Sequence, residues 1–329
     1  MHRRAVLAAV TTLALLACGP AASQERYPNK PVKILVPYAP GGATDIAARI
    51  VAERLRQILG QSFVIENKPG AFGIVAVEEM ARARPDGYTL MVGNPSTNVI
   101  TPIIHAKRMT VDYEKSVVLL ARLVDLPSFL IATTKNFAPT TVAELVAYAK
   151  ANPGKVRYGS AGMGSFPHYG MEVFARHAGI EMTHIPNKGG GSAYLKDIMI
   201  GDLHVGTMNV ATATPALKSG AIRLLAVAEE TRLADFPDLP SYGDLGFRRP
   251  GAGFWHSLFA PAATPRPVLE ILHKAVLEAM ESPDVIAAFN QNRMRRIPHR
   301  TLDEGSAWLK QEMESWRKIT AEIPMDISE

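Results

Sequence analysis

The chain has 329 residues, which is enough for two domains or for one large α/β domain. Apolar residues make up 47% of it and charged residues 20%, an ordinary composition for a globular protein. The formal net charge is +5, but no Lys/Arg-rich run occurs, so we expect no nucleic-acid partner.

Residues 1–23 have the pattern of a secretory signal peptide. Arg3 and Arg4 form a basic start, an apolar run covers Ala5–Ala17, and small residues follow. The run is too short to span a bilayer. Cleavage after "AAS" would leave a soluble exported chain with 34 basic and 31 acidic residues, a net charge of +3. Alternatively, "LLAC" resembles a loose lipobox and would make Cys18 a lipidated N-terminus. We favour the soluble form. Because Cys18 is the only cysteine, no disulfide is expected.

Short apolar runs alternate with helical patterns in the first part of the chain. The expected elements, in order, are a strand Val32–Pro37, a helix Ala43–Leu59 ended by Gly60, a strand Ser62–Glu66, a helix near Ile74–Ala83 and a strand Tyr88–Val92. Strands that are apolar along their whole length and separated by helices predict a parallel sheet covered on both faces.

A second set of such elements starts near Leu130. Thr141 and Glu144 have the spacing of a capping box and predict a helix that ends at Asn152-Pro153-Gly154. The elements expected after it are a strand Lys155–Tyr158, a helix His168–Ala178, a strand Met182–Ile185, a helix Ala193–Ile200, strands near His204–Thr207 and Leu224–Ala228, and helices Pro267–Met280 and Leu302–Thr320. We therefore expect two doubly wound domains. Residues 24–126 with 248–329 would form domain 1, and residues 127–247 would form domain 2.

Three loops that are rich in glycine or small residues each precede a helix: Ala39–Thr44, Ser160–Ser165 and Lys188–Ser192. Open α/β sheets bind ligands beyond the carboxyl ends of their strands. The first turn of a helix offers unpaired N–H groups and about half a positive charge, and glycine lets a ligand approach the backbone. Any one of these loops could be an ordinary tight turn. Their presence in both halves predicts a carboxylate site built largely from backbone groups.

Three side chains near these loops each have two interpretations. Asp45 would stabilise the first turn of its helix, which we favour, or would pair with an ammonium group on the ligand. His168 would hydrogen-bond a ligand carboxylate or have only a structural role. Lys188, beside Gly189, would act as a counter-ion or be a solvated surface lysine.

Catalytic and metal-binding motifs are absent from the sequence. Gly162-Met163-Gly164 lacks the rest of a dinucleotide fingerprint, no P-loop or G-x-S-x-G pattern occurs, and the nine histidines show neither HExxH nor i/i+4 spacing. We therefore expect no enzyme, no metal and no cofactor. Trp255, with Phe254 and Phe259, is interpreted as core or hinge packing.

Several segments are specific when taken together, among them "VPYAPGGATDIAAR", "GQSFVIENKPGAFG", "ARPDGYTLM", "VRYGSAGMGS" and "HIPNKGGGSAYLKDIMIGDL". In order and spacing, from about Tyr27 to Thr320, they resemble the Bug-type (TctC-like) solute-binding receptors of tripartite tricarboxylate transporters. The resemblance implies a periplasmic-binding-protein type II (Venus flytrap) architecture. It also implies a monomer that holds a small carboxylate between its domains and presents it to membrane transporter subunits.

The resemblance also places the site. One ligand carboxylate would lie at the Ala39–Asp45 loop and the other end of the ligand near Ser160–His168. The family's Lys-Gly stretch falls on Lys188–Gly190, and pocket-lining positions fall on Asn94–Asn98 and Asn209. The predicted ligand-binding residues are Tyr38, Pro40, Gly41, Gly42, Ala43, Thr44, Asp45, Asn94, Ser96, Ser160, Ala161, Gly162, Gly164, Ser165, His168, Lys188, Gly189, Gly190 and Asn209.

The chain departs from the family's pattern at three places that affect the polarity of the pocket. Asn187 replaces a tyrosine, Thr101-Pro102 stands for an Asn-Pro pair, and Trp255-His256-Ser257 replaces a tryptophan-polar-glycine stretch. Dicarboxylates, tricarboxylates, aromatic carboxylates and amino acids therefore all remain as ligands.

Two other functions remain open on the same fold. One is a sensory subunit that presents its ligand to a membrane kinase, and the other is an exported enzyme. For the receptor, we expect closure about hinges near Leu126–Phe129 and Phe247–Trp255.

Overall fold

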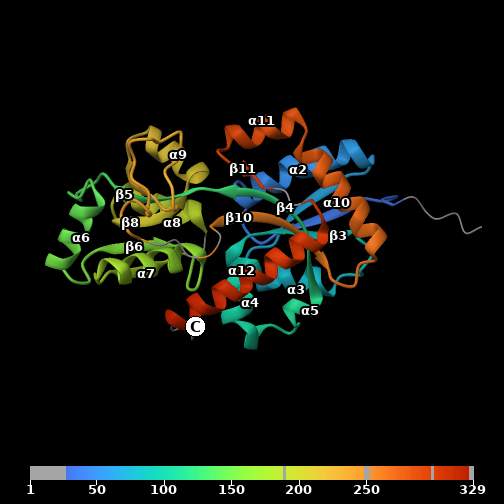
Figure 1. The fold of residues 1–329 in the computed structure, drawn as a ribbon, viewed down its shortest axis with the longest axis horizontal. Coiled ribbons are helices and arrows are strands. Elements are labelled where there is room, and N and C mark those ends of the chain that lie inside the picture. The colour runs from blue at the N-terminus through green and yellow to red at the C-terminus, as the bar shows by residue number, and fades with distance from the viewer. Residues whose placement is uncertain (1–26, 188–189, 248–250, 252, 298–299, 326–329) are drawn as a thin grey trace, which may run out of the picture.

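A computed structural model of the protein describes residues 27–187, 190–247, 251, 253–297 and 300–325, which form two α/β lobes (Figure 1). Lobe 1 surrounds a six-stranded sheet of order β11-β4-β10-β3-β1-β2, and lobe 2 surrounds a five-stranded sheet of order β7-β6-β8-β5-β9. The strands are β1 (Val32–Val36), β2 (Phe63–Asn67), β3 (Thr89–Gly93), β4 (Val117–Leu126), β5 (Ser128–Thr133), β6 (Arg157–Ser160), β7 (Thr183–Pro186), β8 (Val205–Asn209), β9 (Ile222–Val227), β10 (Phe254–Pro261) and β11 (Arg295–Arg296).

Helices cover both faces of the lobe 1 sheet because its strands are apolar on both faces. Neighbouring side chains of a strand point to opposite sides, so Ile34 belongs to one core layer and Leu35 to the other. On the Ile34 side lie α2 (Ala43–Leu59), α10 (Arg266–Met280) and α11 (Pro283–Gln291). On the Leu35 side lie α3 (Ile74–Arg82), η2 (Ser96–Ile100), α4 (Thr101–Ile104), α5 (Tyr113–Ser116) and α12 (Leu302–Glu322), with the short turns η1 (Ala71–Gly73) and η3 (Ala106–Arg108) between them in the chain.

The lobe 2 sheet is covered in the same way. One core layer joins α6 (Val142–Ala151) and α7 (Phe166–Ala178) to the sheet, and the other joins α8 (Gly191–Ile200) and α9 (Val210–Lys218). In the described part of the chain, no helix is both long and apolar enough to cross a membrane.

A single residue, Pro127, separates the last residue of β4 in lobe 1 from the first residue of β5 in lobe 2. The chain returns to lobe 1 through β10, which lies antiparallel to β4. Contacts between the lobes also reach α12, which extends under lobe 2 in Figure 1. The Arg176 guanidinium donates to the Glu322 carbonyl at 2.9 Å, and the rings of Tyr169 and Trp316 meet edge to face at 5.6 Å between centroids.

Most predicted elements are present, with three corrections. The prediction of parallel sheets was incomplete: β1 pairs in parallel with β2 and β3, but β10 runs antiparallel to both β3 and β4, because β4 carries the chain out of the lobe and β10 brings it back. The strands β4, β5, β10 and β11 and the helices α4, α5, α9 and α11 were not predicted. The capping box of α6 is only half formed. Thr141 accepts the Glu144 amide, but the Glu144 carboxylate accepts from Thr140 instead of from Thr141.

Candidate functional site

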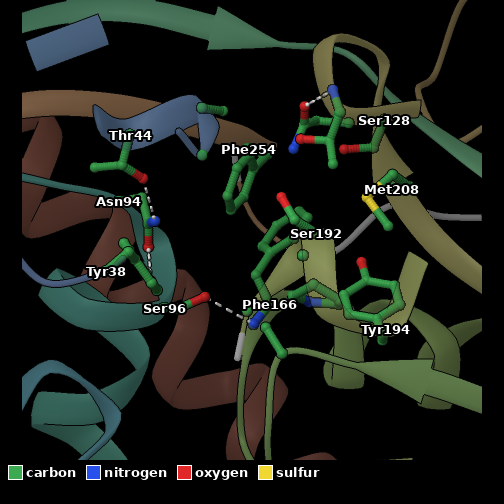
Figure 2. Close-up of a pocket in the computed structure, with 18 of the residues that line it drawn as sticks. Tyr38, Thr44, Asn94, Ser96, Ser128, Phe166, Ser192, Tyr194, Met208 and Phe254 are labelled. Atoms are coloured by element: carbon green, nitrogen blue, oxygen red, sulfur yellow. Dashed lines mark hydrogen bonds between the residues drawn. The ribbon is translucent and has the colours of Figure 1, made fainter. Parts of the chain in front are cut away.

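A cavity of about 120 Å³ lies between the two lobes, and Figure 2 shows the side chains around it. Lobe 1 contributes the loop before α2, the segment after β3 and the start of β10, whereas lobe 2 contributes the starts of α7 and α8 and the ends of β8 and β6. The lining residues are Tyr38, Ala39, Pro40, Gly42, Ala43, Thr44, Asn94, Ser96 and Phe254 from lobe 1, and Ser128, Ala161, Phe166, Pro167, Gly190, Gly191, Ser192, Tyr194, Thr207, Met208, Asn209 and Thr212 from lobe 2. None of these side chains carries a charge.

Two of the helices that begin at this cavity have glycine as the N-cap residue, so no side chain of the N-cap residue caps them. The first turn of α2 follows Gly42, and the first turn of α8 follows Gly190. A helix start without a cap leaves backbone N–H groups unpaired and carries partial positive charge. The cavity therefore offers an anion two sets of backbone donors, one from each lobe.

Asp45 is turned away from the cavity, although it lies in the first turn of α2. Its side chain is buried and accepts hydrogen bonds from the Gly41 amide at 2.9 Å, from Asn67 at 3.0 Å and from two nitrogens of Arg49 at 2.9 and 3.0 Å. Burial would raise the pKa of this carboxyl, but the hydrogen bonds from Arg49, Gly41 and Asn67 outweigh burial and lower the pKa. Asp45 thus fixes the Gly-Gly loop and has no acceptor site left toward a ligand ammonium group.

A chain of hydrogen bonds lines the lobe 1 side. The Tyr38 hydroxyl donates to Asn94 Oδ1 at 3.1 Å, and Asn94 Nδ2 donates to Thr44 Oγ1 at 3.3 Å (Figure 2). Behind them, His256 Nε2 lies 2.8 Å from Thr44 Oγ1. These bonds hold two hydroxyls and an amide in fixed positions at the edge of the cavity.

On the lobe 2 side, the polar side chains at the cavity are held by hydrogen bonds to backbone groups. The Tyr194 hydroxyl donates to the Thr207 carbonyl at 2.6 Å, and Asn209 Oδ1 caps α9 by accepting the Thr212 amide at 3.0 Å. This leaves the Nδ2 group of Asn209 without a protein acceptor in the described structure. Met208 and the Tyr194 ring give the same wall an apolar surface (Figure 2).

A second cavity of about 290 Å³ adjoins the first and shares Tyr38, Ala39, Ser96, Ala161 and Gly190 with it. The Pro69–Gly73 segment of lobe 1 and the Ala161–Ser165 loop of lobe 2 line the remainder. The space between the lobes is therefore a cleft with two compartments.

His168 and Ser160 lie behind the second loop, inside lobe 2. The His168 ring is buried and stacks on His184 at 3.7 Å between centroids, and its Nδ1 accepts the Gly164 amide at 2.9 Å. Burial lowers the pKa of His168 to about 3, with a contribution from the neighbouring His184, and burial lowers that of His184 to about 4. Ser160 Oγ bonds His184 Nε2 at 2.7 Å. Both rings are therefore neutral near pH 7, and they support the loop from within.

Comparison with known proteins decides the family. The sequence model of the tripartite tricarboxylate transporter family receptor matches residues 47–323. The chain belongs to this receptor family. It is also similar to the protein BugT of Bordetella pertussis, with 29% identity and 91% of each chain covered. The predicted resemblance to Bug-type receptors is thereby confirmed.

Solved structures agree with this assignment. An R. palustris protein solved with adipate is 29% identical and has a TM-score of 0.82, over 90% of this chain and 97% of that one. MatC from Rhodopseudomonas palustris, solved with bound malate, is 28% identical and has a TM-score of 0.80, over 89% of this chain and 99% of that one. The two-domain architecture of type II periplasmic binding proteins, predicted from the sequence, is confirmed.

The structure of this receptor brings many of the predicted site residues together. The first cavity is lined by Tyr38, Pro40, Gly42, Ala43, Thr44, Asn94, Ser96, Ala161, Gly190 and Asn209. The second, beyond those shared with the first, is lined by Gly162, Gly164 and Ser165. Gly41, Asp45, Ser160 and His168 line neither cavity. Lys188 and Gly189 lie outside the described residues, as do the signal segment and Cys18.

Several lining residues were not predicted. Ser128, Phe166, Ser192, Tyr194, Thr207, Met208 and Thr212 reach the first cavity from lobe 2, and Phe254 reaches it from β10. For Phe254 and Ser128 a signal existed, because both fall in the predicted hinge segments, but those segments were interpreted as packing and connection only. In the described part of the chain, no group of three or more His, Cys, Asp or Glu side chains is arranged to hold a metal ion.

Proposed function

We propose that this protein is a periplasmic receptor that captures a small carboxylate between its two lobes and presents it to a membrane transporter. The observation that carries the proposal is the cavity between the lobes, into which α2 and α8 open without side-chain caps. Backbone N–H groups at helix starts favour an anion without a charged side chain.

The ligands of the two structural neighbours support a dicarboxylate. Adipate and malate each carry two carboxylates, and the cavity offers one uncapped helix start from each lobe. We place one ligand carboxylate at the first turn of α2, beside Thr44. The other end of the ligand then lies at Gly190–Ser192, and not near His168, because His168 Nδ1 is already occupied by the Gly164 amide.

We also propose that the protein binds its ligand and catalyses no reaction. The Ser160–His184 pair is the arrangement in lobe 2 that most resembles an activated nucleophile, but the Ser160 side chain is fully buried and lines neither cavity. The proposal also includes export by residues 1–23, which mass spectrometry of the protein isolated from the periplasm would test directly.

Domain closure is the expected response to the ligand. We propose one hinge at Leu126–Phe129, where only Pro127 separates the two sheets. The second proposed hinge is Phe247–Trp255, of which residues 248–250 and 252 lie outside the described residues. The proposed domains are residues 24–126 with 248–329, and residues 127–247. A hinge of this kind absorbs the motion in a few residues and leaves each sheet intact.

A thermal titration tests the function. Purified protein is heated with a panel of acids that includes adipate, malate, citrate, benzoate and aspartate, each with its neutral amide or alcohol analogue as the matched control. An acid present at about 100 times its dissociation constant adds roughly 2.7 kcal/mol to the free energy of unfolding, which raises the melting temperature by several degrees. Equal shifts with an acid and its neutral analogue, or no shift with any acid, would contradict the proposal.

A further inference from the structure

A buried histidine stands directly behind the start of α2. His256 belongs to β10 and is fully buried. Alternate residues of β10 point to the same side, and Leu258 and Ala260 belong to the core layer that contains Ala43 of α2. His256 thus lies on the side of β10 that faces α2, between Leu258 and the cavity-lining Phe254, and its Nε2 lies 2.8 Å from Thr44 Oγ1.

The two nitrogens of this ring have different surroundings. Nε2 has Thr44 as its partner, whereas Nδ1 is buried and has no hydrogen-bond partner among the described residues. The ring is neutral, because burial lowers the pKa of His256 to about 3. A neutral imidazole carries one proton, so that proton sits either on Nε2, facing Thr44, or on Nδ1, facing no acceptor.

The position of the proton follows from the cost of the two arrangements. A proton on Nδ1 would be a buried N–H donor without an acceptor, and orphaned buried N–H groups are rarer in proteins than under-used acceptors. A proton on Nε2 leaves only a lone pair unpaired at Nδ1 and donates to Thr44 Oγ1. The second arrangement is therefore the stable one.

Thr44 Oγ1 then has both of its acceptor sites occupied, one by His256 Nε2–H and one by the Asn94 amide at 3.3 Å. Its own proton must point elsewhere, and among the described residues no acceptor receives it. Thr44 lines the first cavity, so that proton has the cavity before it (Figure 2).

We propose that His256 is a positioning residue, which donates to Thr44 Oγ1 from behind and so directs the Thr44 hydroxyl proton onto a ligand carboxylate in the cavity. The inference rests on the proposed function. It gives a cavity whose described lining side chains carry no charge a fixed hydroxyl donor next to the backbone donors of α2.

A double-mutant cycle tests the inference, with adipate and malate as the probes and titration calorimetry as the measurement. Thr44→Val removes the hydroxyl and is expected to weaken binding roughly tenfold to a hundredfold, the worth of a hydrogen bond to a charged group. His256→Leu keeps the Thr44 hydroxyl but removes the donor that orients it, and we expect the affinity for the acid to fall about tenfold. In the Thr44→Val background, His256→Leu should change the affinity by less than about twofold, because its effect passes through Thr44.

Two further variants separate this role from a general loss of structure. His256→Gln keeps an N–H donor at the place of Nε2 and should bind within about threefold of the wild-type protein. Ser257→Ala changes the next buried residue of β10, whose hydroxyl has no partner in the described structure, and should leave the affinity unchanged. A loss with Ser257→Ala equal to that with His256→Leu would overturn the inference.

The remaining outcomes also decide between the inference and the function. If the losses in binding free energy from His256→Leu and Thr44→Val are additive in the double variant, the inference is overturned and the proposed function stands. Failure of the wild-type protein to bind any acid of the panel would overturn both. If His256→Leu does not fold, long-range ¹H–¹⁵N correlation spectra of the wild-type protein locate the proton directly. A proton on Nε2 supports the inference, and a proton on Nδ1 overturns it.

Discussion

The amide N–H of Phe166, the first residue of α7, donates to Ser96 Oγ across the space between the lobes at 3.0 Å. Both residues are buried, and both line the first cavity (Figure 2). The bond supplies α7 with a partner that its own N-cap residue, Ser165, does not provide. Because the donor and the acceptor come from different lobes, it exists only when the lobes are close together.

Ser96→Ala should therefore favour the open form. Loss of one neutral hydrogen bond costs about 0.5–1.5 kcal/mol, so we expect adipate or malate to bind about twofold to tenfold more weakly. Small-angle X-ray scattering of the ligand-free protein should show a larger radius of gyration. Ser306→Ala is the matched control, since Ser306 bonds only the Leu302 carbonyl within α12. Unchanged scattering and affinity in Ser96→Ala would show that this bond does not hold the lobes.

Asp45→Asn tests the interpretation of Asp45 as a loop anchor. The substitution weakens the paired bonds from Arg49 and the bond from Gly41, and we expect a loss of about 1–2 kcal/mol in the free energy of unfolding, reduced by the exposure of Arg49. Glu53→Gln breaks an ion pair with Arg56 on the same helix, and because solvent screens this exposed pair, its effect on the free energy of unfolding should be much smaller than that of Asp45→Asn. Urea unfolding of both variants measures the difference. A direct role in binding predicts instead a large loss of affinity for amino acids with unchanged stability.

The bounds of α2 could be predicted from the sequence because local signals set them. Gly60 adopts the left-handed conformation that ends the helix, and the Gly-Gly pair before Ala43 starts it. Strand β4 was missed because its long apolar run, with Arg122 and Asp125 inside it, has no alternation that separates a buried strand from a buried helix. Helix bounds are local properties, whereas strand order depends on distant partners.

The same difference between local and distant contacts explains which parts of the site could be predicted from the sequence. The loops before α2 and α8 carry their own signal in their glycines, but the part of the lobe 2 wall that β8 contributes does not. Tyr194 and Thr207 become neighbours only because α8 packs on the sheet that contains β8. Thr44 and His256 are 212 residues apart, so no local pattern could show that one hydrogen-bonds the other.

Phe254→Ala should change which ligands bind. The Phe254 ring lies between the lobes, 5.3 Å from the Phe166 ring, and lines the first cavity (Figure 2). Its removal enlarges the cavity, so the affinity for adipate relative to malate should rise. Phe247→Ala, at the other side of the same chain crossing, removes a ring that packs on Phe174 and is the control for stability. Calorimetric titration with both acids measures the ratio, and an equal ratio in the two variants would contradict this role.

The stability of the protein should fall on mild acidification because several histidines resist protonation, among them the buried His168 and His256 and the half-buried His184. Burial lowers the pKa of His168 and of His256 to about 3 and that of His184 to about 4, whereas histidines in the unfolded chain titrate near about 6.5. Between these values the unfolded chain binds protons that the folded chain does not bind. The free energy of unfolding therefore decreases as the pH falls from about 6.5 to about 4, by at most about 1.4 kcal/mol per pH unit for each histidine.

Asp45 adds to this loss only at lower pH. The folded-state pKa of its carboxyl is lowered, so its contribution is fully present above the unfolded value of about 3.9 and disappears as the pH falls below it. Urea unfolding in steps of pH from about 7 to about 5.5 stays above the range in which the carboxylates titrate and so isolates the histidines. His184→Gln should make the slope shallower by up to about 1.4 kcal/mol per pH unit, since it removes one of the histidines whose pKa the fold lowers. His177→Gln, at an exposed position in α7, should leave the slope as it is. A slope in His184→Gln equal to that of the wild-type protein would mean that the stacked pair does not control acid stability.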